Sequence, residues 1–432
     1  MFERGAHFVG LDFNGSPFWD KYIEFEDRNN EQSRATKLYC RVSQIPAYHF
    51  ARYYNKFRPL IGTQSPEDLI DDTTLATLQS AVDSENHGFE RPPLELERQL
   101  RNKIDAYYYD IFTQRTEVAV NARWQQFESR IKRGYFHVTE VEDSDLENWR
   151  KYLDFEERQG DFQRTCFLYE RCLVACALYE EFWLRYARWM FAQGKEEDCR
   201  QIYIRASCIF VPICQPTVRL NWARFEEKLD RTAVARGIHE GILDQNPDHV
   251  ETIISFAGVD RRHYGTDAAV ATLETYIGQR NTQVGGVLAA EQARILWQSK
   301  GAVDEARRLF KEKSDNFLDS KIFWLKYLEF EIAQPSDDQK EAHARVKAIH
   351  DTIRTNGRFT DEDTKALSHY YMEYLMDHGG KDAAEEFMQL DREVNGYVSS
   401  KNIPLPPSGK PHSTAKKRKH KAKSTAVAVP TS

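Results

Sequence analysis

The sequence predicts an all-α protein, an α-solenoid of helix-turn-helix repeats that ends in a disordered basic C-terminal tail. Two aromatic stripes with the same internal spacing support this class, and they lie thirty-four positions apart: Trp149, Tyr152 and Phe155, then Trp183, Tyr186 and Trp189. Positions i, i+3 and i+6 fall within a sector of roughly 120° of an α-helix, so each triplet lies on one helix face. A second helix with its own pattern, Phe167-Leu168-Tyr169-Glu170-Arg171, separates the stripes. A helix pair that returns at this period is typical of a solenoid.

Residues 1–58 are expected to form partial N-terminal repeats. Trp19, Tyr22 and Phe25 give the first complete stripe, and a second helix is expected over 33–42. Residues 49–57 are aromatic with helical period and predict the next first helix. A solenoid end normally needs a polar cap, and none is visible here. We therefore expect either additional upstream repeats or a partner that covers this end.

Residues 59–93 do not continue the pattern of paired helices. Pro59, Gly62, Pro66, Pro92 and Pro93 are turn and breaker residues, so we expect an irregular insert with at most one short helix.

Residues 94–396 are expected to form the main repeat array. First-helix stripes begin at positions 149, 183, 219, 253, about 290 and 324, which gives a period of 35 residues. The stripe weakens at Arg219 and Ile253 and returns in full at Trp324, Tyr327 and Phe330. A further helix pair is expected between Ala342 and Met388.

Residues 397–432 are expected to be a disordered basic tail, because no packed core can come from a composition rich in proline and lysine with a Ser/Thr/Ala/Val end. Residues 401–432 contain eight Lys or Arg and no acid, and subtracting these charges from the net −7 leaves −15 on the first 400 residues. A region with this negative charge is expected to bind the phosphates of nucleic acid poorly. Within the tail, a compact basic cluster is formed by Lys416, Lys417, Arg418, Lys419 and Lys421. This cluster favours a nuclear import signal, and the alternatives are a nucleic-acid-binding arm or ordinary solvated charge.

No catalytic, cofactor-binding or metal-binding residues are predicted. One glutamate lies seven positions after the start of each of five stripes (Glu26, Glu128, Glu156, Glu226 and Glu331). Buried carboxylates persist when they are paired, so each is expected to contact an arginine or a backbone donor on a neighbouring helix, for example Arg171 or Arg205. The cysteines around 166–214 lack zinc-ligand spacing and are expected to be small buried thiols. No apolar run approaches the length of a membrane span.

The stripes are expected to be core rather than base-stacking platforms, because they keep register with the helix pairs. The ring-rich connector at 133–137 is expected to act as a structural clamp between repeats.

The stripe W-x2-Y-x2-[FW]-E, followed by a helix that reads L-Y-E-R, resembles the HAT (half-a-tetratricopeptide) repeat. Within that class, IKRGYFHV at 131–138, LENWRKYLDFE at 146–156 and CALYEEFWLRYARWM at 176–190 resemble the pre-mRNA-processing factor 39 family. Gly134 stands where that family usually has proline.

The resemblance implies a non-catalytic nuclear scaffold that associates with proteins of the U1 small nuclear ribonucleoprotein (snRNP) and, through them, with U1 RNA and pre-mRNA. Its implied role is to support recognition of the 5′ splice site during early spliceosome assembly. It also implies a homodimer, or a heterodimer with a related HAT protein, through the C-terminal repeats at about 315–390. The alternatives are a HAT scaffold of 3′-end cleavage or ribosomal RNA maturation, and direct RNA binding through the basic tail.

Overall fold

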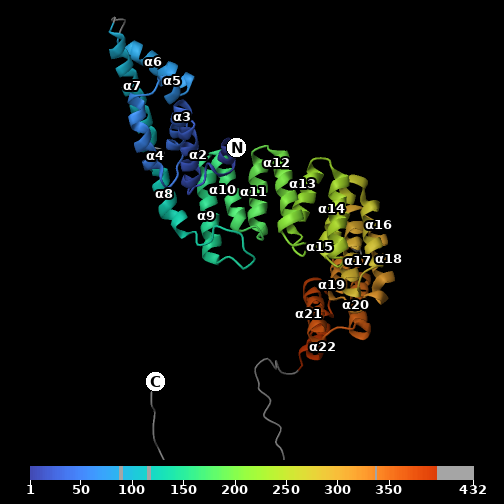
Figure 1. The fold of residues 1–432 in the computed structure, drawn as a ribbon. Coiled ribbons are helices and arrows are strands. Elements are labelled where there is room, and N and C mark those ends of the chain that lie inside the picture. The colour runs from blue at the N-terminus through green and yellow to red at the C-terminus, as the bar shows by residue number, and fades with distance from the viewer. Residues whose placement is uncertain (87–90, 114–117, 336–337, 397–432) are drawn as a thin grey trace, which may run out of the picture. The chain divides into compact units, whose positions relative to one another are not determined.

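The computed structural model describes residues 1–86, 91–113, 118–335 and 338–396, and they form helices joined by short turns (Figure 1). These ranges contain no β-strand, which confirms the all-α prediction. None of their helices combines the length and apolar character that a bilayer crossing requires. The chain divides into two compact units, Met1–Tyr276 and Ile277–Ser432.

The first unit contains the N-terminal helices and most of the regular repeats. Its elements are α1 (Phe2–Val9), α2 (Ser16–Arg28), α3 (Gln32–Ser43), α4 (Phe50–Phe57), η1 (Arg58–Gly62), α5 (Pro66–Leu69), α6 (Asp72–Glu85), α7 (Pro93–Asp110), α8 (Val118–Gln126), η3 (Glu128–Arg130), α9 (Asp143–Gln159), α10 (Phe162–Ala175), α11 (Glu180–Ala192), α12 (Glu196–Arg205), η4 (Ala206–Phe210), α13 (Thr217–Lys228), α14 (Thr232–Gln245), α15 (Val250–Tyr264) and α16 (Thr266–Ile277). The expected first helices from 149 to 253 are α9, α11, α13 and α15. Helix α9 packs against α10, α11 against α12 and α13 against α14.

The turn within each helix pair follows from local sequence. Helix α9 ends at Gly160, whose φ of 76° is a left-handed conformation that glycine adopts without steric cost. The carboxylate of Asp161 then accepts a hydrogen bond from the backbone N–H of Arg164 at 3.0 Å and caps the start of α10. Asp230, with a φ of 59°, occupies the corresponding turn between α13 and α14. One left-handed residue therefore reverses the chain in each of these pairs.

The segment 59–93 is not the irregular insert that was expected. Its described residues carry η1, α5 and α6, and Leu69, Ile70 and Leu75 are buried in a core with residues of α4 and α7. Pro66 and Pro93 occupy the first turns of α5 and α7, where a missing backbone N–H costs nothing. The prolines that suggested a loop are helix starts.

The second unit continues the pairing. Its elements are α17 (Thr282–Arg294), η5 (Ile295–Ser299), α18 (Val303–Lys313), η6 (Ser314–Asn316), α19 (Lys321–Ile332), α20 (Gln339–Asn356), α21 (Asp361–His378) and α22 (Ala383–Asn395). Three helices, rather than one pair, occupy the region around 342–388: α20 packs on α19, and α21 pairs with α22. Tyr371 and Tyr374 of α21 are buried, as expected.

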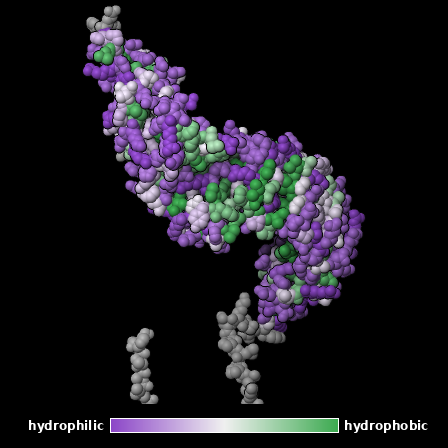
Figure 2. All heavy atoms as spheres, viewed as in Figure 1, coloured by the Kyte–Doolittle hydropathy of each residue, from purple (hydrophilic) through white to green (hydrophobic). Residues whose placement is uncertain are grey.

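The surface carries apolar side chains over part of the first unit. Figure 2 shows hydrophobic residues gathered over the α9–α13 stretch on the face in view. The exposed apolar residues of this stretch include Val174, Ile209 and Ile213, and Ile209 is 68% exposed.

Candidate functional site: the buried contacts that join the repeats

The aromatic stripes lie mainly in the core. Trp19, Trp149, Trp183 and Trp324 are each 1% exposed, and Tyr22, Tyr152, Tyr186, Tyr327 and Phe330 are also buried. Phe155 and Trp189 are partly buried against the core that contains α9–α13. Phe25 is the exception to the predicted core set, with 46% exposure. The ring that it contacts is Phe2 of α1, with centroids 5.2 Å apart, and this short helix leaves much of Phe25 uncovered.

Trp19, Trp183 and Trp324, which each open a stripe, also hold the loop before their helix. The indole Nε1–H of Trp183 donates to the carbonyl oxygen of Ala177 at 2.8 Å, and that of Trp324 donates to Phe317 at 3.0 Å. Trp19 makes the same kind of bond, to Gly10 at 3.0 Å. A buried carbonyl without a donor costs free energy, so these bonds fix where each loop enters the next helix.

Arg219 stands where these stripes have tryptophan, and it performs the same task with a guanidinium group. Its Nη1 donates to the carbonyl oxygens of Pro212 at 3.0 Å and Gln215 at 3.3 Å, and its Nη2 donates to Val211 at 2.8 Å. Nη2 also donates to Ser207. The apparent weakening of the stripe at this position is thus a change of donor, from an indole to a guanidinium.

A second contact repeats across the boundaries between helix pairs. Arg200 of α12 donates from Nε to Glu226 of α13 at 2.7 Å, and the glutamate is 1% exposed. In the second unit, Arg307 of α18 donates to Glu331 of α19 at 2.6 Å. In each case the second helix of one repeat supplies the cation and the first helix of the next supplies the carboxylate. Burial of such a carboxylate is tolerated because a cation neutralises it.

Sequence reasoning missed one member of this series. Asp260 of α15 is 1% exposed and pairs with Arg236 of α14. Thr272 also donates its hydroxyl to Asp260, at 2.6 Å. Asp260 lies seven positions after Ile253, the same offset as the glutamates, so accepting aspartate in the pattern would have found it.

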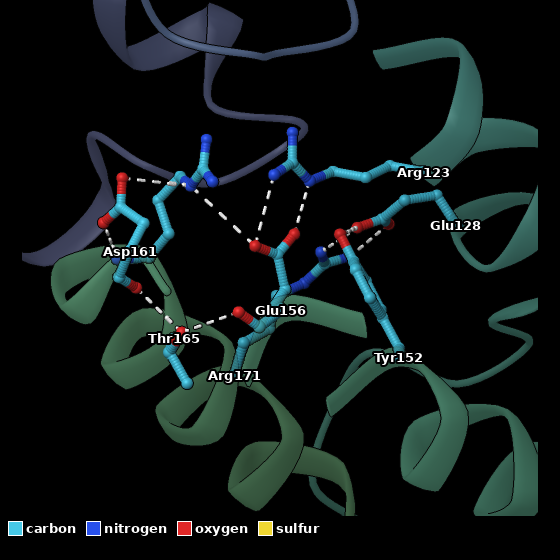
Figure 3. Close-up of polar contacts among 8 residues, drawn as sticks. Arg123, Glu128, Tyr152, Glu156, Asp161, Thr165 and Arg171 are labelled. Atoms are coloured by element: carbon cyan, nitrogen blue, oxygen red, sulfur yellow. Dashed lines mark hydrogen bonds and ion pairs between the residues drawn. The ribbon is translucent and has the colours of Figure 1, made fainter. Parts of the chain in front are cut away.

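The junction of α8 and η3 with α9 and α10 holds two buried ion pairs (Figure 3). Arg123 and Glu156 are 4% and 3% exposed, and the Nη2 atom of Arg123 donates to Oε2 of Glu156 at 3.2 Å. Arg171 donates to both oxygens of Glu128, at 2.6 and 2.9 Å. The hydroxyl of Tyr152 donates to Glu128 at 2.9 Å, and burial raises its pKa well above the usual value. Burial lowers the pKa of Arg171, but its hydrogen bonds to Glu128 outweigh that effect and raise it overall.

The recurrent glutamates therefore all have arginine partners, including Glu26, whose Oε2 lies 4.0 Å from Nη1 of Arg34. Of the two arginines proposed as partners, Arg171 contacts a recurrent glutamate. Arg205 instead contacts Glu170, at 2.9 and 2.7 Å.

The expectation that the cysteines at 166–214 are buried thiols is correct for three of the six. Cys172, Cys176 and Cys199 are buried and Cys166 is partly buried, but Cys208 and Cys214 are exposed. Burial raises the pKa of the Cys199 thiol to about 12. Within the described ranges, no three His, Cys, Asp or Glu side chains cluster as metal ligands.

The connector at 133–137 divides into a clamp and an exposed tip. Arg133 donates from Nη1 to the carbonyl oxygen of Thr139 at 3.0 Å and from Nη2 to that of Ala175 at 3.4 Å. The rings of Tyr135 and Phe136 are 63% and 49% exposed. Arg133 thus ties the connector to α10, while the rings face solvent. The predicted import cluster at 416–421 lies outside the described residues.

Comparison with known proteins now identifies the repeats. Residues 121–262 match the family described as PRP39 C-terminal HAT repeat, and residues 1–59 match PRP39 N-terminal HAT repeat. A pre-mRNA-processing factor 39 from Schizosaccharomyces pombe is 40% identical over 419 residues, which cover 92% of this chain and 68% of that protein. The chain belongs to the pre-mRNA-processing factor 39 family. The buried contacts described above are therefore the internal joints of a HAT array.

Other relatives extend the comparison. The human pre-mRNA-processing factor 39 is 28% identical, and the match covers 88% of this chain and 58% of that protein. The chain thus spans 68% and 58% of the lengths of these two relatives. The U1 small nuclear ribonucleoprotein component PRP42 of Saccharomyces cerevisiae is 25% identical over 44% of this chain and 35% of its own length. A crystal structure of CstF-77 shares the fold, with a TM-score of 0.52, 17% identity and coverage of 92% of this chain and 84% of that one.

Proposed function

We propose that this chain is a non-catalytic scaffold of the U1 snRNP in pre-mRNA splicing. In this role it supports recognition of the 5′ splice site and early spliceosome assembly through contacts with U1 proteins. The observation that carries the proposal is the 40% identity to a pre-mRNA-processing factor 39 over 92% of the chain. The likeness to a protein named as a U1 component adds support. U1 RNA and pre-mRNA are reached indirectly, because an acidic repeat array favours protein partners over phosphate.

The internal chemistry agrees with a scaffold. Glu226, Asp260 and Glu331 are matched by arginines across the boundaries between helix pairs, and these pairs hold helices together at fixed positions. An array of this kind offers long surfaces to partners. The same fold occurs in CstF-77, but at 17% identity that likeness shows the fold alone and does not favour a role in 3′-end cleavage.

Purification of the tagged chain from nuclear extract, followed by RNA sequencing and protein mass spectrometry, tests this function. Enrichment of U1 RNA together with U1 proteins is the expected result. Ribonuclease treatment before capture should leave the U1 proteins bound, because the contacts are proposed to be between proteins. Recovery of cleavage factors or nucleolar components in place of U1 would contradict the proposal.

We further propose dimerisation through the last repeats, at about 315–390. Helices α21 and α22 expose Met376 and Met388, which are 62% and 66% accessible. Methionine is a flexible apolar side chain that is frequent at binding surfaces. The partner is a second copy or a related HAT protein.

The protein is proposed to act in the nucleus, with Lys416, Lys417, Arg418, Lys419 and Lys421 as its import signal. Fusion of residues 410–423 to a fluorescent reporter, with and without replacement of these five residues by alanine, tests that role. Nuclear accumulation of the unmodified fusion alone is expected.

A further inference from the structure

Helix α22 of the second unit is held to its neighbours by few apolar contacts. The helix lies wholly within the described residues, and of its 13 side chains only Leu390 is buried. Helix α21, against which it packs, has six buried residues. Elements that bury little apolar surface open locally at a lower free-energy cost than the rest of a fold. Helix α22 is therefore expected to open more readily than α21.

A polar cavity lies between α22 and α20. Its volume is about 130 Å³, and polar or charged side chains form most of its lining. A cavity removes the close contacts that interdigitated side chains would make, so dispersion attraction between these helices is reduced. The ion pair of Arg354 with Glu393, at 2.8 Å, has both side chains more than a third exposed and contributes little. Other polar contacts must therefore hold α22 in place.

One carboxylate of α22 accepts from both neighbouring helices. Tyr371 of α21 donates its hydroxyl to Oε1 of Glu386 at 2.8 Å, and Nζ of Lys347 in α20 lies 3.1 Å from the same oxygen. Nε2 of His343, also in α20, lies 3.1 Å from Oε2. An ionised carboxylate only accepts hydrogen bonds, so all three groups donate to it. Burial raises the pKa of Glu386, but the bonds from Tyr371 and Lys347 outweigh that effect and lower it overall.

The connection to α22 is suited to a hinge. Gly379 and Gly380 follow α21 directly, and glycines absorb changes of backbone conformation at low cost. We propose that α22 docks and detaches as a unit, with Glu386 as the residue that keeps it docked. Met388 of the proposed dimer contact lies on this helix and is 66% exposed. Dimerisation therefore requires the docked helix, a step that rests on the dimerisation proposed above.

Hydrogen–deuterium exchange of the full-length chain, read by mass spectrometry, tests the docking of α22. In the wild type, the amides of α22 should exchange at least about tenfold faster than those of α21. Glu386→Gln keeps the shape of the side chain but removes its charge. It should accelerate exchange in α22 about tenfold further and leave exchange in α19 unchanged. Exchange of α22 in step with α21 in the wild type would overturn the proposal, because the helix would then not open by itself.

The preceding residue supplies a matched control. Glu385 is exposed and lies in the same first turn of α22, so Glu385→Gln makes the same change of charge at the same helix end. Exchange in α22 should stay at the wild-type rate. Equal acceleration in both variants would mean that charge at the helix end matters rather than the contacts of Glu386, and would overturn the role given to that residue.

A change in α21 tests the same contact without altering α22. Tyr371→Phe removes the hydroxyl but keeps the ring, which stacks on His350 with centroids 4.3 Å apart. Exchange in α22 should rise about threefold, because one donor to Glu386 is lost. Tyr374→Phe, on the same helix, is the control and should have no effect. Equal exchange in the two variants would contradict the role of Glu386.

Light scattering tests the link to dimerisation. At a concentration where the wild type is a dimer, Glu386→Gln should shift the mass toward the monomer, whereas Glu385→Gln should not. A Glu386→Gln chain that exchanges faster in α22 yet remains dimeric would overturn the link. A monomeric wild type would instead refute the dimerisation itself, and the exchange rates would still decide whether Glu386 holds the helix.

Discussion

Arg200 of α12 and Glu226 of α13 form an ion pair at 2.7 Å across the boundary between two helix pairs, and the glutamate is 1% exposed. Trp222 donates its indole N–H to the same carboxylate at 3.0 Å. Glu226→Ala would remove the buried carboxylate that accepts from Arg200 and Trp222, and it should destabilise the fold by about 3 kcal/mol. Urea denaturation followed by circular dichroism measures the change. The control is Glu251→Ala, whose carboxylate is 68% exposed and 3.9 Å from Arg224, and it should cost less than about 1 kcal/mol.

Exchanging the charges of Arg307 and Glu331 in the second unit tests whether their ion pair stabilises the contact between α18 and α19. Glu331→Arg should destabilise the chain strongly, because it places a cation beside Arg307 and Arg345. Adding Arg307→Glu should restore part of the lost stability. No recovery in the double variant would argue that the carboxylate acts in some other way than as the partner of Arg307.

The donors that hold the loops give a further prediction. Trp324→Phe keeps a ring in the core but removes the bond from Nε1 to the carbonyl oxygen of Phe317. A loss of about 1–2 kcal/mol is expected, since a buried acceptor is left unsatisfied and some volume is lost. Arg219→Met should cost more, because several loop carbonyls lose their donor together. Thermal unfolding of the two variants ranks them, and a smaller effect at Arg219 would contradict this account.

Stability should fall with acidification because of a buried histidine in α20. Burial lowers the pKa of His350 to about 4, from an ordinary value of 6.5. The folded state therefore favours the neutral ring, so its contribution is complete above about pH 6.5 and is lost as the pH falls through 4. Its full size is at most about 3 kcal/mol. Urea midpoints between pH 7 and 4 should fall less steeply for His350→Gln than for the wild type. The exposed His369→Gln should keep the wild-type slope.

The segment 59–93 should behave as core. Leu69 is fully buried, so Leu69→Ala should cost about 3 kcal/mol. Leu94→Ala is the matched control, because Leu94 is 79% exposed and should contribute little. Equal stability of both variants, measured by urea denaturation, would indicate that α5 and α6 do not pack as described.

The proposed dimer contact can be tested by the molar mass in solution. Met376→Glu/Met388→Glu should shift light-scattering mass from dimer to monomer, because charge is introduced into an apolar contact. Ile209→Glu, at a side chain 68% exposed in the first unit, should leave the mass unchanged. A dimer that persists in the methionine variant would place the contact elsewhere.

Sequence reasoning predicted the periodic part of this fold because Trp149, Trp183 and Trp324 repeat with the helix pairs. The prediction was wrong where one residue type occurs in two kinds of structure, as proline does in loops and in the first turn of helices. Pro66 is a loop signal in the sequence, yet it starts a helix. Phe25 has the stripe spacing, but spacing does not reveal that only a short helix lies against it. The pairing of Arg123 with Glu156 could not be predicted from the sequence. The number of residues between an arginine and its glutamate differs from one helix boundary to the next.

The guanidinium of Arg219 shows that an N–H donor other than a tryptophan ring can hold the preceding loop from the first stripe position. The tryptophan codon UGG becomes an arginine codon by one base change, so a repeat can exchange one donor for the other without passing through a residue that lacks it. Profiles built only on tryptophan would therefore undercount repeats in related arrays, and accepting arginine at this position should recover them.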